Sequence, residues 1–278
     1  MKLNMFYVDD IIKTAINEDI NYIDTSADLV FDENDSTTAY FQAKADGVLC
    51  GLDVALRVFE LLDSTFKATV YKKDGDFVKS GELIADFSGK TACLLKGERT
   101  ALNLLQNMSG FATSTNNAIK KIEGTNASVA DTRKTLPGLR ALQKYAVTVG
   151  GGKNHRYNLS DGVMLKDNHI DACGSITKAV EKVRQNLGHM VKIEVETRNL
   201  EEVKEALNTG VEVIMLDNMS CDDMKKAVEI TNGKALLEAS GNITDETIAN
   251  VAKTGVDIIS IGALTHSVKA FDISMKIK

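Results

Sequence analysis

The stretch ADTRKTLPGLRALQKYAVTVGGGKNHRYNLSDGVMLKDNHI, residues 130–170, holds an unusual density of basic and imidazole side chains. Seven lysines and arginines stand against three acids, so the stretch carries a net charge of +4 within a chain of net charge −6. A local positive region in an acidic protein indicates a pocket for a small polyanion, because a nucleic-acid surface needs basic residues over a wide area. The basic residues are Arg133, Lys134, Arg140, Lys144, Lys153, Arg156 and Lys166.

The same stretch opens a regular β/α alternation that continues through the C-terminal part of the chain. Apolar runs predict strands near 127–131, 162–165, 191–195, 212–216, 235–239 and 257–261, mostly separated by amphipathic segments of helix length. Polar or glycine residues recur where these strands end, and β/α barrels build their active sites at the carboxyl ends of parallel strands. Six strands are fewer than the usual eight. We therefore predict an open, incomplete β/α barrel over residues 110–267, which carries the active site.

The first third of the chain mixes helices and strands. Its spacing predicts helices at 5–18 and 53–63 and strands at 39–49, 66–71 and 82–87, with a turn at Asp74-Gly75 between the last two strands. A helical stretch at 91–122, loosened at Ser109-Gly110, carries the predicted domain boundary. We expect an α+β domain over residues 1–109, with residues 268–278 as a candidate to pack back on it. The fold class is α/β.

Composition and cysteine usage exclude several classes of protein. The chain is 44% apolar and 26% charged, which is typical of a soluble globular enzyme. It has no apolar run of about 18 residues, and its N-terminus acquires acids too early for a signal peptide, so we predict a cytoplasmic protein with no membrane partner. The four cysteines (Cys50, Cys93, Cys173 and Cys221) form no CxxC pair. Buried free thiols are the expected state, with no disulfide and no structural metal site.

Eight ordered blocks carry a resemblance that spans the chain nearly end to end. They are GERTALN (97–103), DTRKTLPGLR (131–140), GGGKNHRYNLSD (150–161), LKDNHI (165–170), EVE (194–196), LDN (216–218), ASGNI (239–243) and IGALTHS (261–267). Together they closely resemble quinolinate phosphoribosyltransferase, a family also called nicotinate-nucleotide pyrophosphorylase (carboxylating). The resemblance implies an N-terminal α/β sandwich domain followed by an open α/β barrel. It also implies that quinolinate and phosphoribosyl pyrophosphate give nicotinate mononucleotide, pyrophosphate and CO₂, a step of de novo NAD biosynthesis.

Quinolinate has two carboxylates, and arginine suits a carboxylate through its bidentate fork. The resemblance assigns Arg99, Arg133, Arg156 and His155 to quinolinate. The assignment of Arg99 to quinolinate rests mainly on the resemblance, because a lone arginine in a helix is most often a solvated surface charge. His155 lies in a polar loop, which favours a functional role over a core histidine.

Two lysines follow predicted barrel strands, where an ammonium group can reach carboxylate or pyrophosphate oxygens. The resemblance gives both Lys134 and Lys166 substrate contacts, and we predict that they act in catalysis. Lys153 is a further candidate contact from its loop. Arg140 and Lys144 lie one turn apart on a predicted helix and can equally form a solvated face.

Glu196 and Asp217 end adjacent predicted strands, and we count both as catalytic. Two carboxylates in a basic pocket are costly unless they meet hydroxyls or a cation, and the resemblance places both at the phosphoribosyl substrate. Mg²⁺ bound to the pyrophosphate would supply that cation, and we expect Glu196 and Asp217 to hold it indirectly, through substrate or water. We leave Glu194 out of the residues that contact substrate, on the expectation that alternation in a regular strand turns it to the opposite face, although a barrel interior can also accept such a residue. Asp217 could instead cap the next helix, but Ser220 or Asp222 is better placed for that.

Small residues follow two further predicted strands, at Ser240-Gly241-Asn242 and at Gly262-Ala263. They fit a phosphate site, because small residues let backbone N–H groups approach an anion. Without the other strand ends beside them, Ser-Gly and Gly-Ala pairs often mark plain turns. The run Gly150-Gly151-Gly152 predicts a loop that orders over substrate, or else a helix C-terminal breaker. Asn242, often glycine in relatives, is a mild departure. The predicted substrate contacts are Arg99, Thr132, Arg133, Lys134, His155, Arg156, Lys166, Glu196, Asp217, Ser240, Gly241, Asn242, Ile261, Gly262 and Ala263.

The resemblance also implies a homodimer, alone or within a higher oligomer. In relatives the N-terminal domain of one chain covers the barrel of the other, so Arg99 is predicted to complete the partner's site. Two other functions stay open at this point. One is a paralogue, linked to molybdenum transport or acting on another aromatic acid. The other is a non-catalytic polyanion-binding module, which the acidic pair Glu196 and Asp217 disfavours.

Overall fold

The computed structural model describes residues 2–278, and the chain forms two compact units. The N-terminal unit comprises Met1–Asn116, Thr135–Gly151 and Ser267–Lys278. The C-terminal unit comprises Asn117–Lys134 and Gly152–His266. The long helix α4 (Thr91–Lys121) therefore contributes to both units, and the sequence-predicted boundary between residues 109 and 110 falls inside it.

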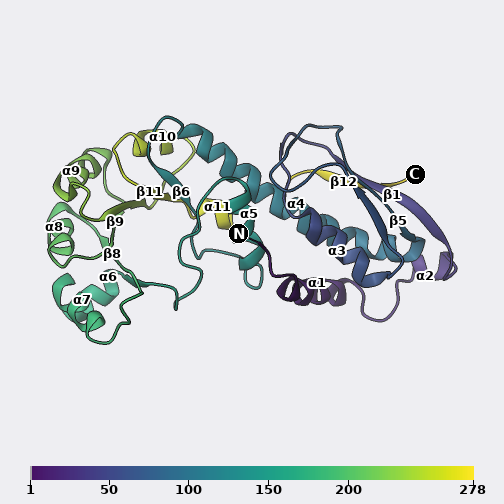
Figure 1. The fold of residues 1–278 in the computed structure, drawn as a ribbon, viewed down its shortest axis with the longest axis horizontal. Helices are drawn as coiled ribbons and strands as arrows, with labels where there is room; N and C mark the ends of the chain where they lie inside the picture. Colours follow the sequence, from purple (N-terminus) through teal and green to yellow (C-terminus); the bar gives the residue numbers. More distant parts are fainter. Residues whose placement is uncertain (1) are drawn as a thin grey trace. The chain divides into compact units, whose positions relative to one another are not determined.

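The N-terminal unit is built on a four-stranded antiparallel sheet in the order β12-β1-β5-β3 (Figure 1). Its core gathers aromatic rings on one face, where the Phe41 and Phe87 centroids lie 4.8 Å apart and those of Phe59 and Phe87 lie 5.2 Å apart. The strands are β1 (Ser36–Ala43), β3 (Lys67–Val70), β5 (Leu83–Lys90) and β12 (Ile273–Ile277), with a separate pair of β2 (Gly47–Val48) and β4 (Phe77–Val78). The helices are α1 (Met5–Asp19), α2 (Ala27–Val30), α3 (Leu52–Leu62), the first part of α4, and α5 (Arg140–Val149).

Six parallel strands form the sheet of the C-terminal unit, in the order β6-β11-β10-β9-β8-β7. The strands are β6 (Ser128–Ala130), β7 (Val163–Leu165), β8 (Ile193–Thr197), β9 (Val213–Asp217), β10 (Leu236–Ser240) and β11 (Ile258–Ser260). Each lies within two residues of its prediction. Strands β6 and β7 stand at the two edges and do not pair with each other in the described chain, so the sheet is open. The predicted α/β class, with an N-terminal sheet domain and an open parallel sheet, is confirmed.

Helices follow the strands of this unit and cover one side of the sheet (Figure 1). Side-chain caps begin three of them: Ser175, Asn199 and Ser220 accept hydrogen bonds from the first-turn N–H groups of α7, α8 and α9. The prediction that Ser220 rather than Asp217 caps the helix after β9 is confirmed. The helices are α6 (Asp167–Cys173), α7 (Ile176–Arg184), α8 (Leu200–Asn208), α9 (Cys221–Thr231), α10 (Ile248–Ala252) and α11 (Ala263–His266).

Helix α4 corrects one expectation, because it is continuous where Ser109-Gly110 predicted a loosened turn. The Ser109 hydroxyl donates to the Cys50 carbonyl and accepts from the Cys50 N–H, both at 3.0 Å. A Cβ on Gly110 would overlap the Lys269 carbonyl. The two small residues therefore serve close packing within the N-terminal unit rather than flexibility.

A second correction concerns Lys144, which was considered for a solvated helix face but is fully buried. Its neighbour one turn away, Arg140, is half-buried and donates through Nε to the Thr135 hydroxyl. No helix among residues 2–278 combines the length and apolar character needed to cross a bilayer.

Candidate active site

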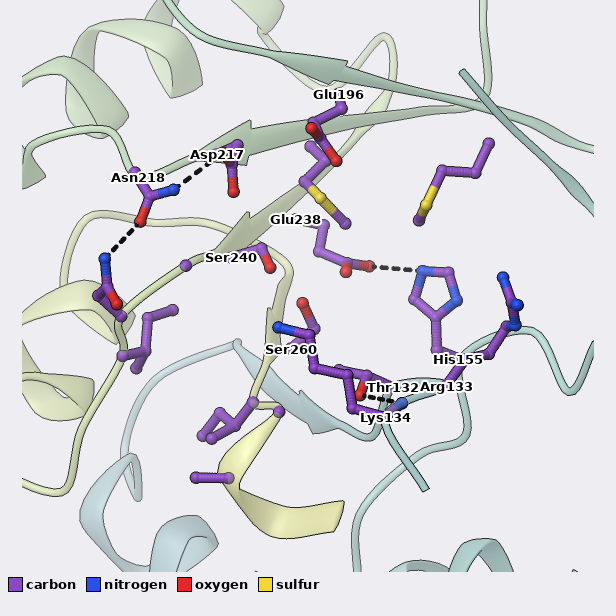
Figure 2. A pocket seen from close by; sticks show the side chains of 18 of the residues that line it. Thr132, Arg133, Lys134, His155, Glu196, Asp217, Asn218, Glu238, Ser240 and Ser260 are labelled. Atoms are coloured by element: carbon purple, nitrogen blue, oxygen red, sulfur yellow. Dashed lines mark hydrogen bonds and ion pairs between the residues drawn. The ribbon is translucent and has the colours of Figure 1, made fainter. Parts of the chain in front are cut away.

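A cavity of about 670 Å³ opens at the carboxyl edge of the parallel sheet, within the C-terminal unit (Figure 2). Side chains and backbone from the ends of β6 to β11 and from the loop after residue 152 converge on it. Every predicted substrate contact except Arg99 lines this one cavity: Thr132, Arg133, Lys134, His155, Arg156, Lys166, Glu196, Asp217, Ser240, Gly241, Asn242, Ile261, Gly262 and Ala263. The residues predicted at the strand ends therefore do line one cavity, and their contacts with substrates stay predictions.

Two guanidinium groups form the basic wall. Burial lowers the pKa of Arg156, the positive charge of Arg133 lowers it further, and Glu194 opposes both effects. The direction shows that the two arginines are close enough to repel each other. Arg156 is fixed by a hydrogen bond from Nη1 to the Gly162 carbonyl at 3.0 Å. Two guanidinium groups that repel each other provide a site for a small dianion, which would relieve their repulsion.

Lys166 lines the same cavity and pairs with Glu196, with Nζ 2.8 Å from Oε2. The Glu196 side chain is mostly buried, whereas that of Lys166 is half exposed. The Lys166 backbone N–H donates to His169 Nδ1, which holds the first turn of α6. The pair neutralises its own charge in the free protein, so an anion that binds Lys166 competes with Glu196.

A chain of hydrogen bonds orients the second acid of the cavity. Asn242 Nδ2 donates to Asn218 Oδ1 at 2.9 Å, and Asn218 Nδ2 donates to Asp217 Oδ2 at 2.9 Å (Figure 2). Both asparagines have left-handed backbones, with φ of 50° and 53°. Gly241, which directly follows β10, also has positive φ, and a Cβ there would overlap the Asn218 side chain. Asparagine tolerates this conformation and supplies the side-chain amide that glycine lacks.

We expect Asn242→Gly to loosen Asp217 without unfolding the protein, because glycine adopts positive φ without strain. On the sequence-based prediction that Asp217 serves Mg²⁺ through substrate or water, the apparent affinity for Mg²⁺ in the presence of phosphoribosyl pyrophosphate should fall by about 3- to 10-fold. This is the lower range of losses for groups that support a metal site from outside its ligand shell. Titration of activity with Mg²⁺ measures this. The matched control is Asn232→Gly, a positive-φ asparagine that caps α9 away from the cavity. Equal effects of the two variants would show that the hydrogen bonds from Asn242 through Asn218 do not orient Asp217 for Mg²⁺ binding.

His155 lines the cavity, and both of its ring nitrogens have partners. Its backbone N–H donates to Asp131 Oδ1 at 2.9 Å, and its Nδ1 accepts from the Arg156 backbone N–H at 2.7 Å. Because Nδ1 accepts, the proton of the neutral ring lies on Nε2. Nε2 is 2.9 Å from Glu194 Oε2 and 3.5 Å from Glu238 Oε2.

His155, Glu194 and Glu238 bring three possible ligand atoms within 4.8 Å of one another, a spacing that a metal ion could bridge. A metal would need the Nε2 lone pair, which would move the proton to Nδ1 and oppose the Arg156 N–H donor. The donor set therefore fits a proton-sharing cluster better than a metal centre.

Glu194 corrects a sequence expectation. We left it out because alternation was expected to turn it away from Glu196, but a strand repeats its face every two residues. Glu194 and Glu196 therefore share a face of β8, and Glu194 meets His155 beside the cavity. Sequence reasoning also missed cavity residues that lie inside strands or come directly after a predicted contact in the chain: Met164, Met215, Asn218, Glu238, Ile243, Thr244 and Ser260.

Three predicted features lie outside the cavity lining. Arg99 is an exposed residue of α4 in the N-terminal unit. Lys153 pairs through its backbone with Val129 and Asp131, and its side chain is exposed. Gly150 follows the last residue of α5, and Gly151 has φ of 95°, so this run does end a helix.

Comparisons with known proteins agree along the whole chain. Models of the N-terminal and C-terminal domains of quinolinate phosphoribosyl transferase match residues 24–109 and 111–276. A Bacillus subtilis protein named probable nicotinate-nucleotide pyrophosphorylase (carboxylating) is 47% identical over 94% of this chain and 90% of its own length. A Methanocaldococcus jannaschii protein of the same name is 40% identical over 98% and 97%.

Solved structures match equally well. The crystal structure of NadC from Streptococcus pyogenes superposes with a TM-score of 0.96, at 43% identity, over 99% of this chain and 98% of that one. The nicotinate-nucleotide pyrophosphorylase of Ehrlichia chaffeensis gives a TM-score of 0.94 at 38% identity, with both chains fully covered. With both domain models matched in order and this identity over nearly the full length, the chain belongs to the quinolinate phosphoribosyl transferase family.

Proposed function

We propose that the protein transfers the phosphoribosyl group of phosphoribosyl pyrophosphate to quinolinate and releases pyrophosphate and CO₂, leaving nicotinate mononucleotide. The observation that carries the proposal is the division of one cavity into a basic wall and an acidic edge. Arg133 and Arg156 form the wall that suits a dicarboxylate. Glu196 and Asp217, at the ends of neighbouring strands, suit a hydroxylated, metal-associated phosphate ester.

The residues work by positioning and electrostatics. The bidentate arginine forks orient the pyridine ring so that its nitrogen faces the ribose. As pyrophosphate leaves, positive charge grows on the ribose C1 and negative charge on the leaving group, where Lys134 and Lys166 stabilise it. Backbone groups of Ser240–Asn242 and Ile261–Ala263 hold the phosphate end of the substrate. No side chain needs to form a covalent intermediate.

We include Mg²⁺ in the proposal, bound with phosphoribosyl pyrophosphate. The donor set fits, because carboxylates are hard oxygen ligands and Mg²⁺ keeps several waters. One oxygen of each acid is already engaged, by Lys166 in Glu196 and by Asn218 in Asp217, which favours contact through water or substrate over direct coordination. When bound, the ion neutralises charge on the departing pyrophosphate.

The assay that tests the reaction follows nicotinate mononucleotide, pyrophosphate and CO₂ from quinolinate, with nicotinate as a competing substrate. Stoichiometric formation of the three products from quinolinate supports the proposal. Product formation from nicotinate without CO₂ release would contradict it and favour a paralogous phosphoribosyltransferase. Anion binding with no turnover would favour a binding module. We also propose a cytoplasmic location, supported by four unpaired cysteine thiols.

We propose that the active enzyme is a homodimer, alone or within a larger oligomer, in which Arg99 completes the quinolinate site of the partner.

We expect Arg99→Ala and Lys166→Ala to be inactive separately and to regain activity when mixed. After random exchange of subunits, about a quarter of the sites carry neither substitution. Native mass spectrometry confirms exchange, and activity on the mixture is the readout. Exchange without recovered activity would show that Arg99 acts within its own chain or has no role.

A further inference from the structure

Two buried carboxylates converge on a single imidazole beside the cavity. Glu194 from β8 and Glu238 from β10 both face His155 Nε2, and their side chains are 8% and 2% exposed. The ring offers one N–H there, because its other nitrogen accepts from the Arg156 backbone. One hydrogen-bond donor cannot satisfy two carboxylates.

The distances decide which carboxylate is left over. Glu194 takes the short contact of 2.9 Å, whereas Glu238 is 3.5 Å away. Oε1 is buried and has no hydrogen-bond partner among residues 2–278 in both Glu194 and Glu238, so the longer contact with His155 is what sets Glu238 apart. A buried carboxylate with too few donors is costly, and binding a proton removes that cost. The geometry therefore favours a neutral carboxylic acid at Glu238.

The surroundings of Glu238 support the same state. Burial raises the pKa of Glu238 to about 7, the charge of Glu194 raises it as well, and His155 and the Ser260 hydroxyl oppose this. Asp131, at the end of β6, adds to the rise. The strand neighbours paired with Glu238 on β9 and β11, Met215 and Ile258, do not titrate.

The proposed reaction needs a proton inside this cavity. When CO₂ leaves, the bond from pyridine C2 to its carboxyl carbon breaks, and the electron pair stays on C2 next to the positively charged ring nitrogen. A hydrogen must then be added at C2 to give the nicotinate ring. Glu238 lines the cavity between the basic wall and the acidic edge (Figure 2).

We propose that Glu238 is the acid that delivers this proton to C2, an inference that rests on the proposed function. The Glu238 O–H bond breaks, the C2–H bond forms, and Glu238 is left as a carboxylate. It regains its proton from water before the next turnover, so atoms and charges balance. The lysines are less suited, because loss of a proton from Lys134 or Lys166 would remove a cation from beside the substrate anions.

The test compares wild-type protein with Glu238→Gln and Glu238→Asp. We expect Glu238→Gln to slow decarboxylation in a single turnover by about 100-fold or more, with quinolinate affinity by calorimetry nearly unchanged. Glu238→Asp keeps an acid and should recover part of the rate. The wild-type rate should fall as pH rises through about 7, because the acid is then ionised, and Glu238→Gln should lack this fall. Glu194→Gln removes a negative neighbour, so its fall should begin at lower pH.

A second readout does not depend on the rate. In an equal mixture of H₂O and D₂O, the hydrogen-to-deuterium ratio at C2 of the product reflects the group that delivers the proton. We expect this ratio, measured by mass spectrometry, to change in Glu238→Gln. A rate within threefold of wild type, or a slower rate with an unchanged ratio and pH profile, would overturn the proposal. If wild-type protein releases no CO₂ from quinolinate, the proposed function itself fails, which is a distinct result.

Discussion

Arg156→Ala should raise the KM for quinolinate about 30- to 150-fold, because it removes a charge-assisted bidentate contact worth about 2–3 kcal/mol. Arg133→Ala should act in the same direction. The KM for phosphoribosyl pyrophosphate should change far less, since these two guanidiniums belong to the basic wall and not to the acidic edge formed by Glu196 and Asp217. Initial rates with each substrate varied in turn measure both constants.

The control for this prediction is Arg184→Ala. Arg184 donates from Nη2 to the Gly210 carbonyl at 2.7 Å, much as Arg156 donates to the Gly162 carbonyl, but it is exposed and lies outside the cavity. Its loss should leave both KM values near those of the wild type. Equal losses for the two substrates in Arg156→Ala would remove the arginine from the quinolinate role.

The sequence predicted the cavity well because its residues follow a topological rule. Parallel strands place their carboxyl ends at one edge, so Arg133, Lys166, Glu196 and Asp217 had to converge whatever the details of packing. The strands themselves are short apolar runs bounded by polar residues, and each was predicted to within two residues.

What the sequence missed depends on burial that no local pattern reveals. Glu238 lies inside an apolar strand and reads as a residue of the sheet, yet it meets His155 from the loop after residue 152. Lys144 has a helical spacing typical of a solvated face and is buried nonetheless. Ser109-Gly110 reads as a weak point of a helix, and only the position of Cys50 and Lys269 shows that small residues are needed there.

The ion pair between Lys166 and Glu196 explains how one cavity accommodates both charges. Their 2.8 Å contact neutralises the pair, and in the proposed mechanism an anionic substrate displaces Glu196 from Lys166. The displaced carboxylate then needs a new partner, which ribose hydroxyls or a hydrated cation supply. Binding of the phosphoribosyl substrate and release of this ion pair are therefore one event in the proposed mechanism.

Glu196→Gln and Asp217→Asn should each raise the Mg²⁺ concentration needed for half-maximal activity by about 10- to 100-fold, the range expected when a carboxylate that supports a metal through water is lost. The KM for phosphoribosyl pyrophosphate should rise with it. Quinolinate binding to the free protein should survive, because neither acid belongs to the arginine wall. Calorimetry with quinolinate and activity titrations with Mg²⁺ separate the two effects.

Asp245→Asn is the matched control, an acid paired with Lys121 outside the cavity. If quinolinate affinity collapsed while the Mg²⁺ requirement stayed at the wild-type value, the two acids would have to be reassigned to the dicarboxylate end of the cavity.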